Sequence, residues 1–262
     1  MLPTSTKALI LDMDGVLWRD TQPIGDLPEI FTRIRDRGLK FTFGTNNSTK
    51  TTDEFLHTMS GFGVELEPWQ IITSSLAMAE ALKRNFPNGG PVFLIGENGI
   101  EQALIDSGFQ PVQDPQDCAR PVAVVVGFDR LCTYAKLRRA TLLIRAGIPF
   151  YGTNPDKTFP TPEGLVPGAG SLLAAISAAS DIQPKVIGKP SPELFCLALE
   201  RMGTTPDVTL VVGDRLETDI TAGQAAGCKT AVVLTGVATR EQAETWNPKA
   251  DFIAENLSAL VG

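Results

Sequence analysis

Two aspartates, Asp12 and Asp14, directly follow an apolar run, residues 8–11, and precede Gly15. At roughly 4 Å and an effective dielectric constant of about 20, two such carboxylates repel each other by about 4 kcal/mol. A proton, a basic side chain or a metal ion must offset this repulsion, and carboxylate oxygens are ligands that suit Mg²⁺. Taken alone, the pair is typical of a strand-ending turn with solvated aspartates. Other residues must therefore distinguish a turn from a site.

Four further residues have side chains that suit the same chemistry: Thr45, Lys189, Asp214 and Asp219. Several carboxylates beside one another repel strongly without a cation, but with Mg²⁺ they form a metal site of the kind that binds substrate phosphate. Lys189 and the Thr45 hydroxyl could donate hydrogen bonds to phosphoryl oxygens. An aspartate carboxylate can also attack phosphorus and form an aspartyl-phosphate. These residue types therefore indicate phosphoryl chemistry, provided that the fold brings them together.

The elements that would position these residues alternate between strands and helices. Unbroken apolar runs predict buried strands, helical spacing of apolar residues predicts helices, and strand–helix–strand alternation predicts a parallel sheet. The strands that precede the candidate residues span residues 8–11, 39–43, 185–188 and 209–212. Carboxyl ends of parallel strands face one crevice. Each residue alone could still be an ordinary turn or helix-start residue, but their matching positions favour a shared site.

Composition limits the possible partners. The 262 residues include 43% hydrophobic and 20% charged residues, which is typical of a globular protein. A net charge of −7 argues against binding a nucleic acid polymer. The four cysteines are too widely spaced for a zinc knuckle or a redox motif, and no apolar run is long enough for a signal peptide or a membrane span. We expect a cytoplasmic protein that binds neither nucleic acid nor membrane.

Four stretches, at residues 12–16, 45–48, 188–192 and 213–220, contain the candidate residues in this order along the chain. Through these stretches the sequence resembles the haloacid dehalogenase (HAD) superfamily, and within it the class IIA branch of 4-nitrophenyl phosphatases and NagD-like proteins. The resemblance spans nearly the whole chain in the order of the four superfamily motifs. These motifs match Asp12-Met-Asp14-Gly15-Val16, Thr45-Asn46-Asn47-Ser48, Gly188-Lys189-Pro190-Ser191-Pro192 and Gly213-Asp214-Arg215-Leu216-Glu217-Thr218-Asp219-Ile220. The stretches Thr153-Asn154-Pro155-Asp156 and Pro167-Gly168-Ala169-Gly170 resemble the same branch.

The resemblance implies a role for each matched aspartate. Asp12 would be the nucleophile and a Mg²⁺ ligand. Asp14 would bind Mg²⁺ through its backbone carbonyl and serve as general acid, then as general base toward water. Asp214 would ligate Mg²⁺, and Asp219 would contact the site residues without binding the metal or the substrate directly. Dehalogenases of the superfamily lack an aspartate at the position of Asp14, so the resemblance favours phosphate-ester hydrolysis over dehalogenation.

It also implies which residues bind phosphate and substrate. Thr45, Asn46 and Asn47 would hold the phosphate, and Lys189 would neutralise the nucleophile and the phosphoryl group. In a cap domain, Asn154 and Asp156 are the candidate substrate contacts. A hinge or packing turn with no substrate contact remains an alternative for these two residues.

Spacing between the motifs predicts the domain organisation. One helix and one strand fill the chain between Asp14 and Thr45, whereas the chain between Thr45 and Lys189 is far longer than the sheet requires. We therefore expect an α/β fold with a Rossmann-like parallel core (the HAD fold), formed by residues 1–74 and 183–262. Residues 75–182 would form an inserted α/β cap domain, of the C2 type in family terms. Such a lid would exclude water and supply substrate contacts, and its apolar strands could pair in a homodimer.

The leading functional hypothesis is a Mg²⁺-dependent phosphomonoesterase that acts on a small phosphorylated metabolite through an aspartyl-phosphate on Asp12. One alternative is phosphotransfer to another acceptor through the same intermediate. The other alternative is a catalytically silent binding or regulatory protein with the same fold. The complete set of motif residues argues against a silent protein, and the motifs do not distinguish among sugar phosphates, nucleotides, aryl phosphates and other small esters.

Overall fold

The computed structural model describes residues 2–114, 116, 120–161 and 163–262, which form two compact units. The core unit comprises Met1–Thr45, Thr52–Ile72 and Lys189–Gly262, and the insert unit comprises Asn46–Thr51 and Thr73–Gly188. This division differs from the predicted boundaries chiefly because the short segment after Thr45 groups with the insert. The identification of the insert as a cap stays a prediction. No described helix is both long and apolar enough to cross a bilayer.

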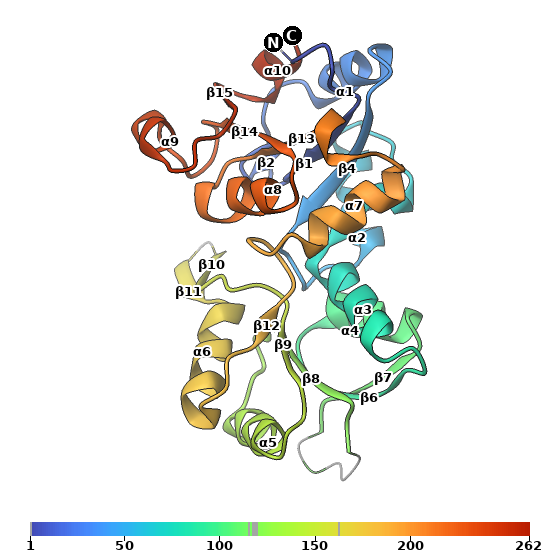
Figure 1. Cartoon of the computed structure of the whole chain (residues 1–262), viewed down its shortest axis with the longest axis vertical. Helices are drawn as coiled ribbons and strands as arrows, with labels where there is room; N and C mark the ends of the chain where they lie inside the picture. Colours follow the sequence, from blue (N-terminus) through green and yellow to red (C-terminus); the bar gives the residue numbers. More distant parts are fainter. Residues whose placement is uncertain (1, 115, 117–119, 162) are drawn as a thin grey trace. The chain divides into compact units, whose positions relative to one another are not determined.

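The core unit is built on a sheet with the strand order β15-β14-β13-β1-β4-β5 (Figure 1). Strand β1 lies between β13 and β4 and pairs with both in parallel, with Leu9 opposite Leu210 and Phe41. Because all of β1 is buried, its apolar run is unbroken. The predicted parallel α/β core is therefore confirmed. The strand bounds are β1 (Ala8–Leu11), β4 (Lys40–Thr45), β5 (Ile71–Thr73), β13 (Thr209–Gly213), β14 (Lys229–Val233) and β15 (Phe252–Ala254).

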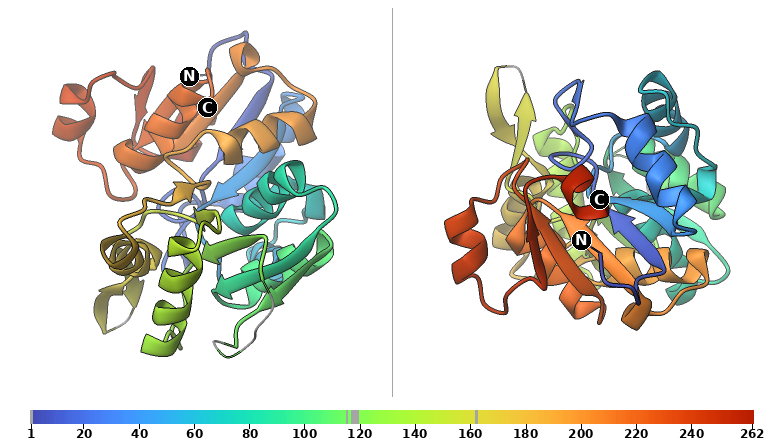
Figure 2. Two further views of the ribbon diagram at one scale, coloured as in Figure 1. Left: turned by 60° about the horizontal axis from the view of Figure 1, so that its bottom comes forward. Right: turned by 90° about the horizontal axis from the view of Figure 1, so that it is seen from above.

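Helices cover both faces of this sheet (Figure 2). Helix α1 packs against α10, whereas α7 packs against β1 and β4. A Cβ at Gly44 in β4 would lie 2.9 Å from both Leu194 and Phe195 of α7, so the small residue permits this close contact. The helix bounds are α1 (Leu27–Asp36), α2 (Thr52–Gly61), α7 (Glu193–Met202), α8 (Thr221–Ala225), α9 (Arg240–Thr245) and α10 (Leu257–Val261).

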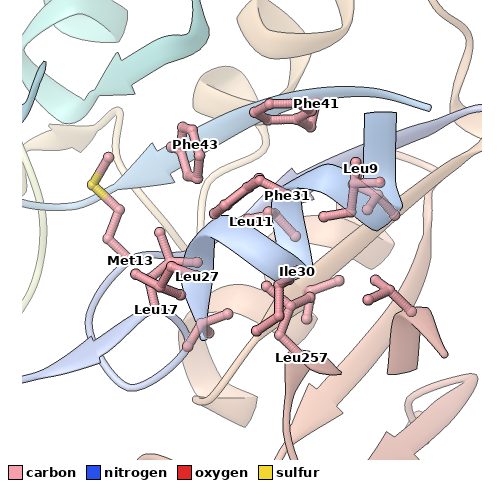
Figure 3. Packing of buried hydrophobic residues seen from close by; sticks show 14 of the residues in the cluster. Leu9, Leu11, Met13, Leu17, Leu27, Ile30, Phe31, Phe41, Phe43 and Leu257 are labelled. Carbon is pink, nitrogen blue, oxygen red and sulfur yellow. The ribbon is translucent and has the colours of Figure 1, made fainter. Parts of the chain in front are cut away.

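A hydrophobic cluster fixes β1, β4 and α1 together (Figure 3). Phe31 of α1 lies with its ring centroid 5.1 Å from Phe41 and 5.6 Å from Phe43, both on β4. Leu9 and Leu11 project from β1 into the same cluster and are completely buried. Burial of each such side chain contributes about 1.5–3 kcal/mol. The carboxyl end of β1 is thus held on a rigid support.

Short elements link this core to the loops that follow its strands. A two-stranded hairpin, β2 (Trp18–Arg19) and β3 (Gln22–Pro23), comes directly after the Asp12–Gly15 turn. Three further short turns of helix are η1 (Pro68–Gln70), η2 (Pro206–Val208) and η3 (Leu216–Ile220).

The insert unit has its own parallel sheet, in the order β12-β9-β8-β6-β7. Helix α3 packs against α4, and α5 packs against α6. The stretch from Gly152 to Gly170 contains an antiparallel hairpin, β10–β11. Its prolines and glycine conceal the strand pattern. The bounds are α3 (Ser74–Asn85), β6 (Gly90–Ile95), α4 (Asn98–Asp106), β7 (Phe109–Val112), β8 (Ala123–Val126), α5 (Tyr134–Arg145), β9 (Phe150–Gly152), β10 (Thr158–Thr161), β11 (Gly164–Pro167), α6 (Ala169–Ser180) and β12 (Lys185–Val186).

Candidate active site

A buried lysine connects the predicted residues of the core unit. Lys189 Nζ lies 2.6 Å from Asp12 Oδ1 and 2.6 Å from Asp219 Oδ1, and it donates a third hydrogen bond to the Gly44 carbonyl at 3.0 Å. An ammonium group has three N–H donors, enough for these three acceptors. The side chain therefore joins the ends of β1 and β4 to the η3 turn after β13. The structure brings Asp12, Lys189 and Asp219 together, as the sequence predicted.

Burial and charge shift the pKa values of this group in a consistent way. Burial alone would lower the pKa of Lys189, but the charges of Asp12 and Asp219 raise it above its ordinary value. Burial raises the pKa of Asp12 well above its usual range, the Asp219 charge adds to this effect, and Lys189 opposes it. A buried carboxylate held against more acids than bases is destabilised in its charged form. The group therefore has too little positive charge for its aspartates.

Asp214 follows β13 and completes the group. Its Oδ2 atom accepts a hydrogen bond from the Val237 N–H at 2.8 Å, and its carbonyl accepts one from the Ala238 N–H at 3.0 Å. Its Oδ1 atom is buried without a protein partner. Burial raises the pKa of Asp214 to about 6, with the Asp219 charge as the next contribution. A buried carboxylate oxygen without a hydrogen-bond partner destabilises the folded protein unless a ligand binds it.

Asp12, Asp214 and Asp219 each offer an oxygen, and these three oxygens lie within 4.8 Å of one another. This donor set fits Mg²⁺, which prefers carboxylate oxygens and commonly takes one or two carboxylates from the protein. Asp219 already uses Oδ1 for Lys189 and Oδ2 for the Arg215 N–H at 3.0 Å. Asp12 and Asp214 are therefore the better candidates for metal ligands, and Asp219 is better suited to holding Lys189.

Two glycines surround the Asp214 carboxylate. A Cβ at Gly15 would lie 2.4 Å from Asp214 Oδ2, and one at Gly236 would lie 1.9 Å from the same atom. Gly15 also has a φ of +80°, a conformation that L side chains rarely adopt. The sequence analysis missed Gly236 and Val237, which belong to the loop after β14. The only signal for them was a glycine three residues after the end of an apolar strand.

Asp14 lies outside the three-carboxylate group and is exposed. Its Oδ1 atom accepts a hydrogen bond from the Trp18 indole N–H at 2.9 Å. The two aspartates of the opening pair thus have different surroundings, since Asp12 is buried on Lys189 and Asp14 is open to solvent on one side. Trp18 was not predicted as a site residue, although its position four residues after Asp14 can be read from the sequence.

Thr45 ends β4 and is buried, and the residues that follow it belong to the insert unit. The Asn46 carbonyl accepts hydrogen bonds from Ser74 Oγ at 2.7 Å and from Asn154 Nδ2 at 2.9 Å. Asn46 Nδ2 donates to Asp156 Oδ2 at 3.2 Å. Asn154 and Asp156 therefore fasten the segment after Thr45 within the insert unit. A direct substrate contact by either residue stays a prediction.

Asn47 organises the same segment locally. Its Oδ1 atom accepts hydrogen bonds from the backbone N–H groups of Thr49 at 2.9 Å and Lys50 at 3.2 Å. This is a turn in which an asparagine side chain bonds the backbone two and three residues later. The side-chain oxygen of Asn47 thus shapes the turn, and its predicted role in phosphate binding is untested.

Comparison with known proteins identifies relatives along the whole chain. Family models described as haloacid dehalogenase-like hydrolase and as HAD-hydrolase-like match residues 9–110 and 186–260. An acid sugar phosphatase of Staphylococcus aureus is 32% identical over 255 residues, covering 97% of this chain and 96% of that protein. A p-nitrophenyl phosphatase from Archaeoglobus fulgidus has a TM-score of 0.90 at 32% identity and 98% coverage of both chains. A glycerol phosphate phosphatase from Mycobacterium tuberculosis, in complex with magnesium, has a TM-score of 0.90 at 33% identity, covering 98% of this chain and 76% of that chain.

Proposed function

The chain belongs to the haloacid dehalogenase-like hydrolases and is a phosphatase, and we propose that it is a Mg²⁺-dependent phosphomonoesterase acting on a small phosphorylated metabolite. The observation that carries this proposal is the buried contact of Lys189 with Asp12 at 2.6 Å. A lysine in this position favours the ionised form of a buried carboxylate and can receive the negative charge of a phosphoryl group.

Asp12 is the proposed nucleophile. One of its carboxylate oxygens attacks phosphorus, the bond to the ester oxygen breaks, and a phosphoryl group remains on Asp12. Asp14 gives a proton to the departing oxygen and then accepts one from the water that releases inorganic phosphate. Lys189 stays between Asp12 and Asp219 and limits the charge that accumulates during the transfer. Thr45, with the backbone of Asn46, is proposed to donate hydrogen bonds to the phosphoryl oxygens.

Mg²⁺ would be held by Asp12, Asp214 and the Asp14 carbonyl. When bound, it would supply positive charge to the phosphoryl oxygens. The partnerless Oδ1 atom of Asp214 and the raised pKa values of Asp12 and Asp214 support this assignment. The hydrogen bond from Val237 turns the Asp214 carboxylate so that Oδ2 is occupied and Oδ1 remains available.

The insert unit is proposed to be the cap, and the substrate class is proposed from the relatives. Their names include an acid sugar phosphatase, a p-nitrophenyl phosphatase and a glycerol phosphate phosphatase. These names have in common a phosphate monoester of a small alcohol or phenol. We therefore propose sugar phosphates and glycerol phosphate as the first natural candidates, with 4-nitrophenyl phosphate as a test substrate. Cytoplasmic location and a homodimer formed through the cap stay predictions.

The test is phosphate release from 4-nitrophenyl phosphate and from a panel of sugar and glycerol phosphates. We expect activity with Mg²⁺, its loss in EDTA and its loss in Asp12→Asn, which keeps the size of the side chain but removes the nucleophile. Retention of activity in Asp12→Asn would contradict the covalent mechanism. Formation of a phosphorylated acceptor alcohol in place of inorganic phosphate would favour phosphotransfer.

A further inference from the structure

The hydrogen bond between Trp18 and Asp14 joins a fixed donor to an exposed acceptor. Trp18 is 5% exposed, belongs to the hydrophobic cluster of the core unit, and has its ring centroid 5.9 Å from that of Phe62. Asp14, in contrast, is exposed. An exposed aspartate on its own can occupy several rotamers. The indole N–H, held by packing of its ring, limits that freedom at Oδ1.

The backbone around this pair is also fixed. The Gly15 N–H donates to the Trp18 carbonyl at 2.7 Å, and the Leu17 N–H donates to the Met13 carbonyl at 2.8 Å. These bonds close the turn between β1 and the β2–β3 hairpin. The distance between the Asp14 and Trp18 backbones is therefore set by the turn itself.

The loop after β14 fastens the same turn from a second direction. Thr235 Oγ1 donates to the Gly15 carbonyl at 2.6 Å, and the Arg19 guanidinium donates to the Thr235 carbonyl. Arg19 and Trp18 together form β2, so the strand that carries the indole is attached to the loop that also holds Asp214. This second attachment makes the Trp18 ring a stable support for Asp14.

We propose that Trp18 is a positioning residue for Asp14: its indole N–H occupies Oδ1 and thereby leaves Oδ2 to exchange the proton with the leaving-group oxygen. This inference rests on the proposed function, in which Asp14 is the general acid. Trp18 itself contacts no reacting atom. An indole N–H can only donate, so it can bind the ionised carboxylate without competing for the proton that Asp14 must transfer.

The proposal predicts a dependence on the leaving group. When the ester bond breaks, its electron pair goes to the ester oxygen, which takes the proton from Asp14. A 4-nitrophenolate is a weak base and leaves readily without that proton, whereas a phenolate or an alkoxide needs it. Loosening Asp14 should therefore slow phenyl and alkyl phosphates more than 4-nitrophenyl phosphate.

The test is kcat for Trp18→Phe with 4-nitrophenyl phosphate, phenyl phosphate and glycerol phosphate. We expect the loss with the two poorer leaving groups to exceed the loss with 4-nitrophenyl phosphate by about tenfold, part of the 10²–10⁴-fold typical of general acid catalysis. Inhibition by inorganic phosphate should stay unchanged, since Trp18 does not bind the phosphate. Trp69→Phe, at a partly exposed tryptophan of the same unit, is the matched control.

An equal loss with all three esters would mean that Trp18 only supports the fold, and no loss would mean that it does not position Asp14; either result overturns the proposal. If the wild type releases no phosphate from any ester, or Asp12→Asn remains active, the proposed function fails instead. If Trp18→Phe does not fold, a second measurement compares the NMR resonances of the indole N–H groups in Asp14→Ala with those in the wild type. The Trp18 resonance, identified as the one retained in both Trp69→Phe and Trp246→Phe, should shift, and an unchanged resonance would overturn the proposal.

Discussion

Replacement of Lys189 by methionine should destabilise the protein in EDTA by several kcal/mol. Each carboxylate contact of Lys189 is 2.6 Å long, which corresponds to about 6 kcal/mol of attraction at an effective dielectric constant of about 20. The desolvation of three buried charges offsets much of this attraction, and breaking a buried pair by removing one partner typically costs about 3–5 kcal/mol. Lys189→Met leaves Asp12 and Asp219 buried without their shared counter-charge, so we expect a loss in this range.

Chemical and thermal unfolding of the metal-free protein would measure the effect. At roughly 2–4 °C per kcal/mol for a chain of about this size, the melting temperature should fall by about 10 °C. Lys7→Met, at an exposed lysine, is the control and should change it little. Mg²⁺ should stabilise Lys189→Met more than the wild type, because the variant has one more uncompensated negative charge.

A double variant separates charge from packing. Lys189→Met combined with Asp219→Asn removes one buried positive and one buried negative charge, so it should recover part of the stability lost in Lys189→Met. If Lys189→Met in EDTA is as stable as the wild type, the lysine does not compensate these carboxylates and the electrostatic account of the site is wrong. If the double variant is less stable than Lys189→Met, the loss comes from packing and not from charge.

Three further predictions concern the surroundings of the site. Gly236→Ala would place a Cβ 1.9 Å from Asp214 Oδ2 and should weaken Mg²⁺ binding, measured by calorimetry, by about 10–100-fold. Gly61→Ala is the control and should leave Mg²⁺ affinity unchanged, because no described atom would lie within 4 Å of its Cβ. Equal affinities in the two variants would refute the contact. The pKa of Asp214 in the folded protein, about 6, exceeds the ordinary 3.8, so ionisation of this group opposes folding. The free energy of unfolding in EDTA should therefore fall as the pH rises from about 4 to above 6, by about 3 kcal/mol if Asp214 acts alone. Asp214→Asn should flatten this fall, and an equal slope in the variant would contradict the assignment. Asn154→Ala removes one of the two side-chain hydrogen bonds to the Asn46 carbonyl and should raise KM for all phosphate esters by one common factor. A factor that differs among esters would indicate a direct substrate contact instead.

Much of the fold and the central group of site residues followed from local sequence patterns. The run before Asp12 is entirely apolar because β1 is buried on both faces between β4 and β13, and such a run can be recognised without a structure. The carboxyl ends of parallel strands meet at one edge, so the closeness of Asp12 and Asp214, which follow β1 and β13, could be predicted from the sequence. The strand predicted before Lys189 is not part of this sheet, because β12 pairs with β9 in the sheet of the insert unit, so the position of Lys189 did not follow from the same argument. The motifs also gave the family correctly, as the matches with known hydrolases confirm.

The contacts that orient these residues could not be predicted, because they depend on which atoms meet. The loop after β14 is distant in sequence from Asp214, and only the structure shows that the Val237 N–H reaches Oδ2. The contact of the Trp18 indole with Asp14 depends on the geometry of the β2–β3 hairpin, and a strand of two residues has too little sequence pattern to predict it. The roles expected of Asn154 and Asp156 depended on whether their side chains face a ligand or the Asn46 segment, and sequence spacing has no information on that choice.

The balance of charge bears on which of the clustered acids would hold a cation. When fully ionised, the three clustered carboxylates and Lys189 have a net charge of −2, which equals the charge that one divalent cation would neutralise. Burial is the first cause of the raised pKa values of Asp12 and Asp214, and the charge of Asp219 adds to it. Asp219, in contrast, has both oxygens engaged by Lys189 and the Arg215 N–H, so a cation would have to displace one of these donors to bind it. The electrostatics therefore support the proposed cation at Asp12 and Asp214, with Asp219 holding the lysine that favours the ionised form of Asp12.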